Sequence, residues 1–407
     1  MSKTTLKSKP RSKQKHTPDQ DQVIASQATD EGLDKDPVQN IANHHLNNFD
    51  FLRFVAASTV VFHHSYALLG KNDPLVAWSN GYTSLGDIAV CIFFIISGYL
   101  IASSFEKNRN PINYVAGRFL RIWPALFAAV ILAVFIIGPL NTTFSLSKYF
   151  TDPLTWTYFK NLKLIHLQYD LPGVFNNNPY KDAVNGSIWT LPMEVFMYGV
   201  TFILGMTRLQ KFKSFITLLW VALLVMDMQI FTTPTWKIMP FLWLGAPFII
   251  GKWAIFYLAG TALFLWKGFY RLNGKVALLS LILLAGSCSS SCFRIVSFFA
   301  LPYLVLYLSF KHLSFLNLSN FGKYGDFSYG IYVYSFPIQQ TLVHLLNAHA
   351  SVNRLFAYSF MGSLIAAIAS WHFIEDPALQ LKQKLKQKLK MLFPRPQPQA
   401  PLPETTL

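Results

Sequence analysis

Apolar segments of about twenty residues recur along most of the chain, and they constrain the fold more than any other feature. A bilayer core of about 30 Å is crossed by about 20 residues of helix. Ten segments reach or approach that length, at residues 49–69, 86–105, 122–140, 187–206, 212–231, 248–266, 275–292, 294–310, 326–346 and 354–374. Charged residues make up only 13% of the 407 residues, about half the share in an ordinary soluble domain. The pattern predicts an all-α polytopic membrane protein with about ten transmembrane helices, and it excludes a water-soluble globule.

The positions of the basic residues predict how the helices are oriented. Cytoplasmic loops of membrane proteins carry an excess of lysine and arginine. If the N-terminus is cytoplasmic, most of the 35 lysines and arginines fall in the terminal segments and in the loops on the cytoplasmic side. An even number of spans returns the chain to the side on which it began, so we expect both termini to be cytoplasmic.

The two ends of the chain differ from its apolar part. Residues 1–48 are polar, with a basic cluster before an acidic one, and we expect a disordered extension without a cleavable signal peptide. Residues 49–377 form the predicted transmembrane domain. Residues 378–407 begin with leucines on one helical face between lysines and end in prolines. This pattern predicts a basic amphipathic helix on the inner leaflet, followed by a Pro-rich cytoplasmic tail.

The longest connection, residues 141–186, is external in this topology. It contains the run Asn176-Asn177-Asn178-Pro179 and several aromatic residues. Loops of this length are often functional. The polar and aromatic composition suits a carbohydrate ligand, although an aromatic belt at the membrane interface explains it nearly as well.

Charged and titratable residues inside the predicted spans are costly, and are therefore candidates for function. Arg53 and His64 are eleven residues apart in the first span. On a helix they share one face at a separation of about 16 Å. Two other interpretations stay open: a snorkelling interface residue for Arg53, and a hydrogen-bonded core histidine for His64. His63 is the immediate neighbour of His64, so the choice between the two imidazoles needs mutation.

Glu194 in the fourth span is a candidate partner for His64. From the helical rise, Glu194 lies about 10 Å and His64 about 8 Å below the external surface. A carboxylate that holds one imidazole nitrogen leaves the other nitrogen as a general base. Glu194 as a cap or as a packing residue is the alternative.

Two further motifs have both structural and functional interpretations. Ser97 and Gly98 fall in the middle of the second span, where small residues allow helices to approach closely or line a narrow channel. Arg118 and Arg121 share one helical face at the inner surface. Paired guanidinium groups suit phosphates, although the excess of basic residues in inner loops is the favoured explanation if this motif is taken alone.

The three cysteines are interpreted as buried small hydrophobic residues, and we expect no metal site. Cys288 and Cys292 have the spacing of one helical face. Two isolated thiols are a weak metal signal.

Six motifs follow one another in the order found in the acyltransferase 3 family of integral membrane O-acyltransferases, which the chain resembles from about Asn48 to Pro377. They are Arg53 with His64 after ten residues, Phe93-Phe94-Ile-Ile-Ser97-Gly98, Arg118-x-x-Arg121-Ile-x-Pro124, Trp189-Thr-Leu-Pro-Met-Glu194, Asp326-Phe-Ser-Tyr-Gly-Ile-Tyr and Glu375-Asp-Pro377. The chain is most similar to the branch that acetylates bacterial surface polysaccharides, including lipopolysaccharide. It departs from many relatives at Ser335, where they have a histidine.

The resemblance implies transfer of an acyl group, commonly acetyl, from cytoplasmic acyl-CoA to a hydroxyl of a surface or lipid-linked glycan. His64 would be the catalytic histidine with Arg53 as its companion, and Arg118 and Arg121 would contact CoA. Acyl-CoA would be a substrate, with no permanently bound cofactor, and the protein would lie in the bacterial inner membrane. This mechanism needs a continuous cavity from the two arginines to His64.

Two rival functions fit parts of the pattern. A transporter or flippase of a glycan-linked or anionic lipid also has many spans, intramembrane charge and basic inner loops, but the chain shows no inverted internal repeat. A glycan-binding membrane scaffold without activity would require His64 to be dispensable. The sequence does not indicate a nucleic-acid partner.

Overall fold

The computed structural model describes residues 47–107, 109–232, 247–311, 318–346 and 350–381. Within these ranges the secondary structure is helical, apart from one isolated bridge between Thr142 and Val174. The predicted all-α class is therefore confirmed for the described part of the chain. Residues 1–46 and 382–407, which hold most of the predicted N-terminal extension and the predicted amphipathic tail, lie outside it.

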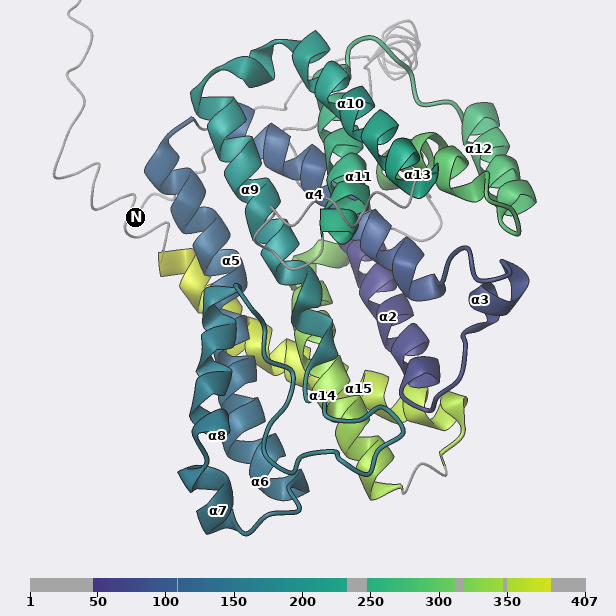
Figure 1. The fold of residues 1–407 in the computed structure, drawn as a ribbon. Coiled ribbons are helices and arrows are strands. Elements are labelled where there is room, and N and C mark those ends of the chain that lie inside the picture. Colours follow the sequence, from purple (N-terminus) through teal and green to yellow (C-terminus); the bar gives the residue numbers. More distant parts are fainter. Residues whose placement is uncertain (1–46, 108, 233–246, 312–317, 347–349, 382–407) are drawn as a thin grey trace, which may run out of the picture.

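A helix occupies each of the ten ranges expected from hydropathy (Figure 1). These helices are α2 (Phe49–Ala67), α4 (Leu85–Lys107), α5 (Pro111–Leu132), α9 (Leu191–Met206), α10 (Lys213–Thr232), α11 (Pro247–Leu265), α12 (Gly274–Ser287), α13 (Phe293–Phe310), α14 (Ser328–Leu345) and α15 (Val352–Ser370).

Five helical segments within the described ranges are long and apolar enough to cross a membrane, which makes this an integral membrane protein. They are Leu85–Lys107, Pro111–Asn141, Gly186–Met206, Phe293–Phe310 and Val352–Leu381. The total of ten spans and the cytoplasmic placement of both termini stay predictions. The helix expected over 275–292 ends at Ser287, so Cys288 and Cys292 lie in the turn before α13 rather than on one helical face.

The third expected helix begins eleven residues earlier than hydropathy indicates. The side chain of Asn110 accepts a hydrogen bond from the backbone N–H of Asn113, and Pro111 occupies the first turn. Both are strong start signals for a helix. The helix continues through a π-helical turn (Ala133–Ile137) into α6 (Gly138–Asn141). Arg118 and Arg121 are therefore one turn apart on a continuous helix.

Glycines set the closest approach between α4 and α11 at the centre of the bundle. A Cβ added at Gly98 would overlap the carbonyl oxygen of Tyr257, and one added at Gly260 would overlap that of Ile95. Small residues at such crossings allow tight van der Waals packing where lipid supplies no hydrophobic driving force. This packing supports the structural interpretation of Gly98, in which a small residue allows two helices to approach closely.

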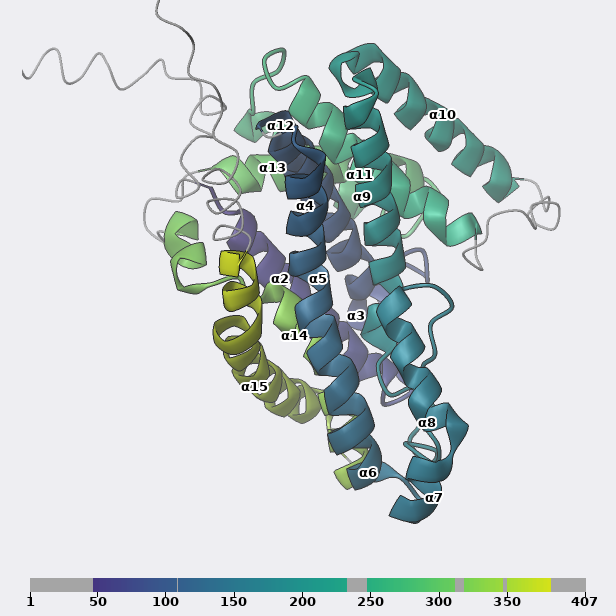
Figure 2. The same cartoon turned by 90° about the vertical axis from the view of Figure 1, so that its left-hand side faces the viewer.

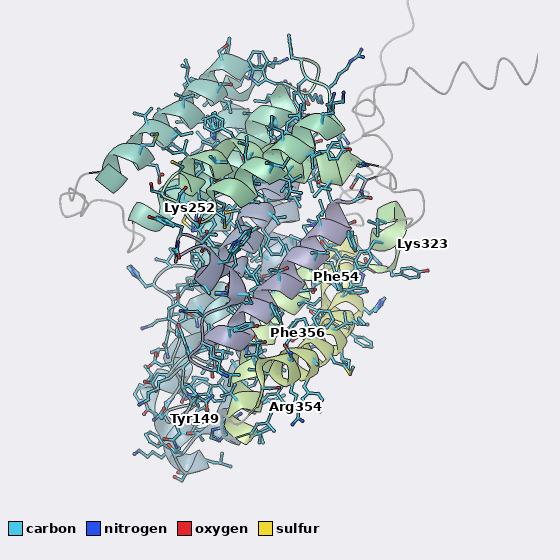
Figure 3. The ribbon with its side chains drawn as sticks, turned by 90° about the vertical axis from the view of Figure 1, so that its right-hand side faces the viewer. Phe54, Tyr149, Lys252, Lys323, Arg354 and Phe356 are labelled. Carbon is cyan, nitrogen blue, oxygen red and sulfur yellow. The ribbon has the colours of Figure 1, made fainter. Side chains whose placement is uncertain are left out.

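Aromatic side chains join α2 to α15 on another face of the bundle. Phe54 packs edge-on against Phe360, and Phe62 packs edge-on against Phe356. Figure 3 shows Phe54 and Phe356 on the side where α2 and α15 meet. Next to these contacts, Gln339 of α14 donates hydrogen bonds to the carbonyl of Val61 and to Ser65 Oγ.

The segment between α6 and α9 is folded rather than irregular. It contains α7 (Leu146–Thr151), α8 (Pro153–Thr157) and a 3₁₀ helix (Tyr158–Lys163), and the region of α6, α7 and α8 forms one end of the molecule (Figures 1 and 2). Asn178 Nδ2 donates to Gln340 Oε1 over 2.8 Å, and Asn185 Nδ2 donates to the carbonyl of Val333 over 2.9 Å. These buried bonds attach the predicted external connection to α14.

Candidate active site

A cavity of about 640 Å³ lies between α2, α4, α5, α9 and α14. Its lining residues on α4 extend from Lys107 to Val90, a length of about 25 Å at the helical rise. Five of the predicted site residues line it, namely Arg53, Ser97, Arg118, Arg121 and Glu194. The fold thus gathers side chains from four helices around one long cavity.

Three arginines line the cavity, and among the described residues Arg118 differs from Arg53 and Arg121 because it has no salt bridge to a carboxylate. Its Nε is buried and makes no hydrogen bond, and no salt bridge to it occurs among the described residues. The guanidinium lies over the ring of Tyr198, 5.6 Å from its centroid. A half-buried guanidinium with an unused Nε–H donor is suited to bind an anion.

Arg121 is already neutralised, in contrast to its neighbour on α5. Its Nη2 lies 2.6 Å from Asp326 Oδ2, and its Nη1 lies 3.8 Å from Glu375 Oε2. Arg53 Nη2 lies 3.1 Å from the same oxygen of Asp326 and also pairs with Asp50. Asp326 thus links α2, α5 and the segment that precedes α14.

Asp326 lies between these two guanidinium groups, which supply the counter-charge for its carboxylate. The hydroxyl and the backbone N–H of Ser328 donate further hydrogen bonds to Asp326 Oδ1. Asp326 belongs to a motif quoted from the sequence, but no site role was predicted for it. Its position at the start of an apolar span was the available signal.

Glu194 lies in this cavity and does not contact His64. Tyr198, one turn further along α9, donates a hydrogen bond from its hydroxyl to Glu194 Oε1. The segment before α9 starts as a 3₁₀ helix at Gly186–Thr190, which rises about 2.0 Å per residue instead of about 1.5 Å. Glu194 is consequently deeper than an α-helical count predicts.

His64 does not line the cavity. Its ring packs edge-on against Phe336, with centroids 5.1 Å apart, and its Nδ1 is buried without a hydrogen-bond partner. Toward His64, the lining residues of the cavity include Phe93, Thr190 and Tyr332.

These three residues form the layer that closes the cavity. Thr190 Oγ1 lies 2.6 Å from the hydroxyl of Tyr332, and the ring of Phe93 lies 5.8 Å from that of Tyr332. Phe336 is one turn beyond Tyr332 on α14, about 6 Å along the axis. The expected continuous path from the arginines to His64 is therefore interrupted by Phe93, Thr190 and Tyr332, with Phe336 between them and His64. We name the first three residues the Thr190–Tyr332 barrier.

Ser97 and Gly98 separate in the structure although they are adjacent in sequence. Ser97 lines the cavity, whereas Gly98 faces the backbone of α11. Among the described residues, no group of three or more His, Cys, Asp or Glu side chains is arranged to hold a metal ion. The candidate site is therefore built from Ser97, Arg118, Glu194 and the salt-bridge network around Asp326.

Comparison with known proteins identifies the family of the chain. The acyltransferase domain family matches residues 46–373 of the chain. The O-acetyl transferase of Shigella phage Sf6 is 29% identical over 348 residues, which cover 82% of this chain and 96% of that protein. Nodulation protein 10 of Rhizobium leguminosarum bv. viciae is 29% identical over 374 residues, covering 86% of this chain and 97% of that protein. No solved structure matches the chain at a comparable level.

Proposed function

The chain belongs to the acyltransferase 3 family and is a membrane O-acyltransferase, and from this premise we propose that it moves an acetyl group from cytoplasmic acetyl-CoA to a hydroxyl of a cell-surface or lipid-linked glycan. The observation that carries the proposal is the long cavity with the unpaired guanidinium of Arg118 in its wall. We further propose the bacterial inner membrane as its location.

The donor half of the proposal rests on charge and shape. CoA is polyanionic and cannot enter hydrocarbon without a large desolvation cost. Arg118 would bind a phosphate of CoA, while Arg121 and Arg53 hold Asp326 and so keep that wall of the cavity in place. The long and thin pantetheine arm would extend along α4 past Ser97, carrying the thioester toward the Thr190–Tyr332 barrier.

The acceptor half rests on the relatives and on the folded connection. One relative is named an O-acetyl transferase. The polar and aromatic segment between α6 and α9 is attached to α14, the helix whose Phe336 packs against His64. A glycan bound on this segment would reach His64 from the side opposite to the cavity.

In the proposed reaction, His64 removes the proton of the acceptor hydroxyl. The oxygen attacks the thioester carbonyl, the carbon–sulfur bond breaks, and the departing thiolate takes the proton from the imidazolium. An acetyl-histidine intermediate is the alternative route. Either route requires the Thr190–Tyr332 barrier to open when donor is bound. The partners of the protein are then acetyl-CoA, a saccharide acceptor and the bilayer.

Replacement of His64 in the host cell tests the proposal. We expect His64→Asn to abolish O-acetylation of the surface glycan, measured by NMR of the purified polysaccharide, while the amount of protein and the binding of acetyl-CoA to the purified protein stay unchanged. Deletion of the gene with no change in O-acetyl content would contradict the function, and unchanged acetylation in His64→Asn would contradict the site. Movement of a labelled lipid without acetyl transfer would favour the transporter.

The two chemical routes are separated by mixing the protein with radiolabelled acetyl-CoA in the absence of an acceptor and quenching rapidly. Label trapped on the protein, and lost from His64→Asn, would favour the acetyl-histidine route. Absence of trapped label under conditions where the donor is bound would favour direct transfer.

A further inference from the structure

A second polar pair lies at the C-terminal end of α2, on the side of the Thr190–Tyr332 barrier away from the cavity. His63 Nδ1 lies 2.5 Å from Asp73 Oδ2. Asp73 precedes the short helix α3 (Pro74–Trp78), and its side chain has no exposed surface, whereas a quarter of the His63 side chain is exposed. No role for Asp73 was predicted from the sequence.

The remaining contacts of Asp73 fix the tautomer of His63. Asp73 Oδ1 accepts hydrogen bonds from the backbone N–H groups of Leu75 and Val76 at 2.9 and 3.0 Å, and Oδ2 accepts one from Leu85 at 3.1 Å. Because this carboxylate accepts from every partner, Nδ1 of His63 is assigned as the protonated nitrogen. In a neutral ring, Nε2 then carries no proton and can accept a hydrogen bond.

The Nε2 atom of His63 is also available. It forms no hydrogen bond with the described residues. The ring lies against Gly86 at the start of α4, where an added Cβ would come within 2.5 Å of His63 Cδ2 and 3.0 Å of Nε2. The rings of His63 and His64 have centroids 5.7 Å apart. The fold therefore presents two neighbouring imidazoles, one held by a carboxylate and one without a polar partner at Nδ1.

We infer that His63, oriented by Asp73, binds a hydroxyl of the saccharide acceptor that neighbours the hydroxyl activated by His64. The inference rests on the proposed function, since it names the part of the site that receives the acceptor. A bare imidazole nitrogen accepts a hydrogen bond from a hydroxyl, and hydroxyls on adjacent carbons of one sugar ring can reach two adjacent imidazoles. His63 would then determine which hydroxyl is acetylated, and Asp73 is a positioning residue that acts through it.

Two substitutions separate this role from a purely structural one. In His63→Asn, the side-chain amide can still donate to Asp73, but nothing replaces Nε2. In Asp73→Asn, the amide oxygen can still cap α3, but the amide nitrogen now donates toward His63. The ring proton then moves to Nε2, which becomes a donor instead of an acceptor. His64→Asn serves as the reference for loss of the base.

The experiment measures the amount and the ring position of O-acetyl groups on the surface polysaccharide by NMR, and the binding of acetyl-CoA to each purified full-length variant. We expect His63→Asn and Asp73→Asn to lower the O-acetyl content about tenfold, as for one lost hydrogen bond, or to move the acetyl group to a neighbouring hydroxyl. Acetyl-CoA binding stays as in the unchanged protein.

Three results would overturn the inference. The first is an O-acetyl content and position within twofold of the unchanged protein in His63→Asn. The second is a loss as complete as in His64→Asn, which would make His63 the base. The third is a joint loss of acetylation and acetyl-CoA binding in both variants, which would make the pair structural. Failure of the proposed function is distinct, because gene deletion would then leave the glycan unchanged.

Discussion

Arg121 Nη2 lies 2.6 Å from Asp326 Oδ2, whereas Arg118, one turn earlier on the same helix, forms no salt bridge among the described residues and leaves its buried Nε without a partner. The two arginines share a motif and a cavity, but their electrostatic situations are opposite. Arg121 contributes to the folded structure through a carboxylate, while Arg118 retains its capacity to bind an anion. The motif therefore combines a structural arginine and a candidate donor-binding arginine.

Replacing each arginine separately tests this division. We expect Arg118→Gln to raise the KM for acetyl-CoA at least tenfold with an unchanged thermal midpoint, because a charged hydrogen bond to phosphate is worth about 1.5–3 kcal/mol. Arg118→Lys keeps the charge and is the matched control, with a smaller increase. Arg121→Gln should instead lower the thermal midpoint. An unchanged KM in Arg118→Gln would place the phosphate site elsewhere.

Asp326 should matter for stability more than any exposed carboxylate. Asp326→Asn leaves Arg53 and Arg121 facing each other without their shared counter-charge, and breaking such a buried pair costs about 3 kcal/mol. Asp50→Asn is the matched control, since Asp50 pairs with Arg53 alone and its side chain is 35% exposed. Thermal unfolding in detergent measures both, and equal effects of the two substitutions would contradict a central role for Asp326.

Hydropathy and spacing predicted what depends on local sequence. Apolar runs located a helix in each of the ten ranges, and Arg53, Ser97, Arg118 and Arg121 all line one cavity. These features follow from the helical period, which the sequence displays directly.

Features that depend on tertiary contacts were missed. The pairing of Arg53 and Arg121 with Asp326 joins residues more than two hundred positions apart, and Asp73 meets His63 through a loop. The depth of Glu194 was misjudged because a 3₁₀ turn precedes α9, and such a turn has no hydropathy signal. The extension of α5 to Pro111 was indicated by Asn110 and Pro111, but the polar residues that follow mask it from a hydropathy window.

Ser97 and Gly98 should respond to substitution in different ways. Gly98→Ala forces a methyl group into the carbonyl of Tyr257, so we expect a clear loss of folded protein, as overpacking costs about 1–3 kcal/mol. Ser97→Cys places a thiol in the cavity wall, where a maleimide should label it and acetyl-CoA should protect it. Background labelling of the three native cysteines is subtracted with the unchanged protein. A tolerated Gly98→Ala would contradict the close packing of α4 against α11. An unprotected Ser97→Cys would contradict the proposed position of the donor.

The Thr190–Tyr332 barrier predicts that access to His64 is controlled by one hydrogen bond. Thr190→Val removes the hydroxyl that lies 2.6 Å from the Tyr332 hydroxyl while it preserves the volume of the side chain. In a His64→Cys background, we expect Thr190→Val to increase several-fold the rate at which a cavity-side methanethiosulfonate reagent modifies the new thiol. In this variant, the side chains of the barrier would separate even when no acetyl-CoA is bound.

Thr201→Val is the matched control for this experiment. It removes an equivalent buried hydrogen bond, from Thr201 Oγ1 to the hydroxyl of Tyr257 over 2.8 Å, but neither residue lines the cavity. We therefore expect an unchanged rate of modification at His64→Cys in the control. Equal rates in Thr190→Val and Thr201→Val would show that the reagent reaches position 64 by another path, and the barrier would then have no part in acyl transfer.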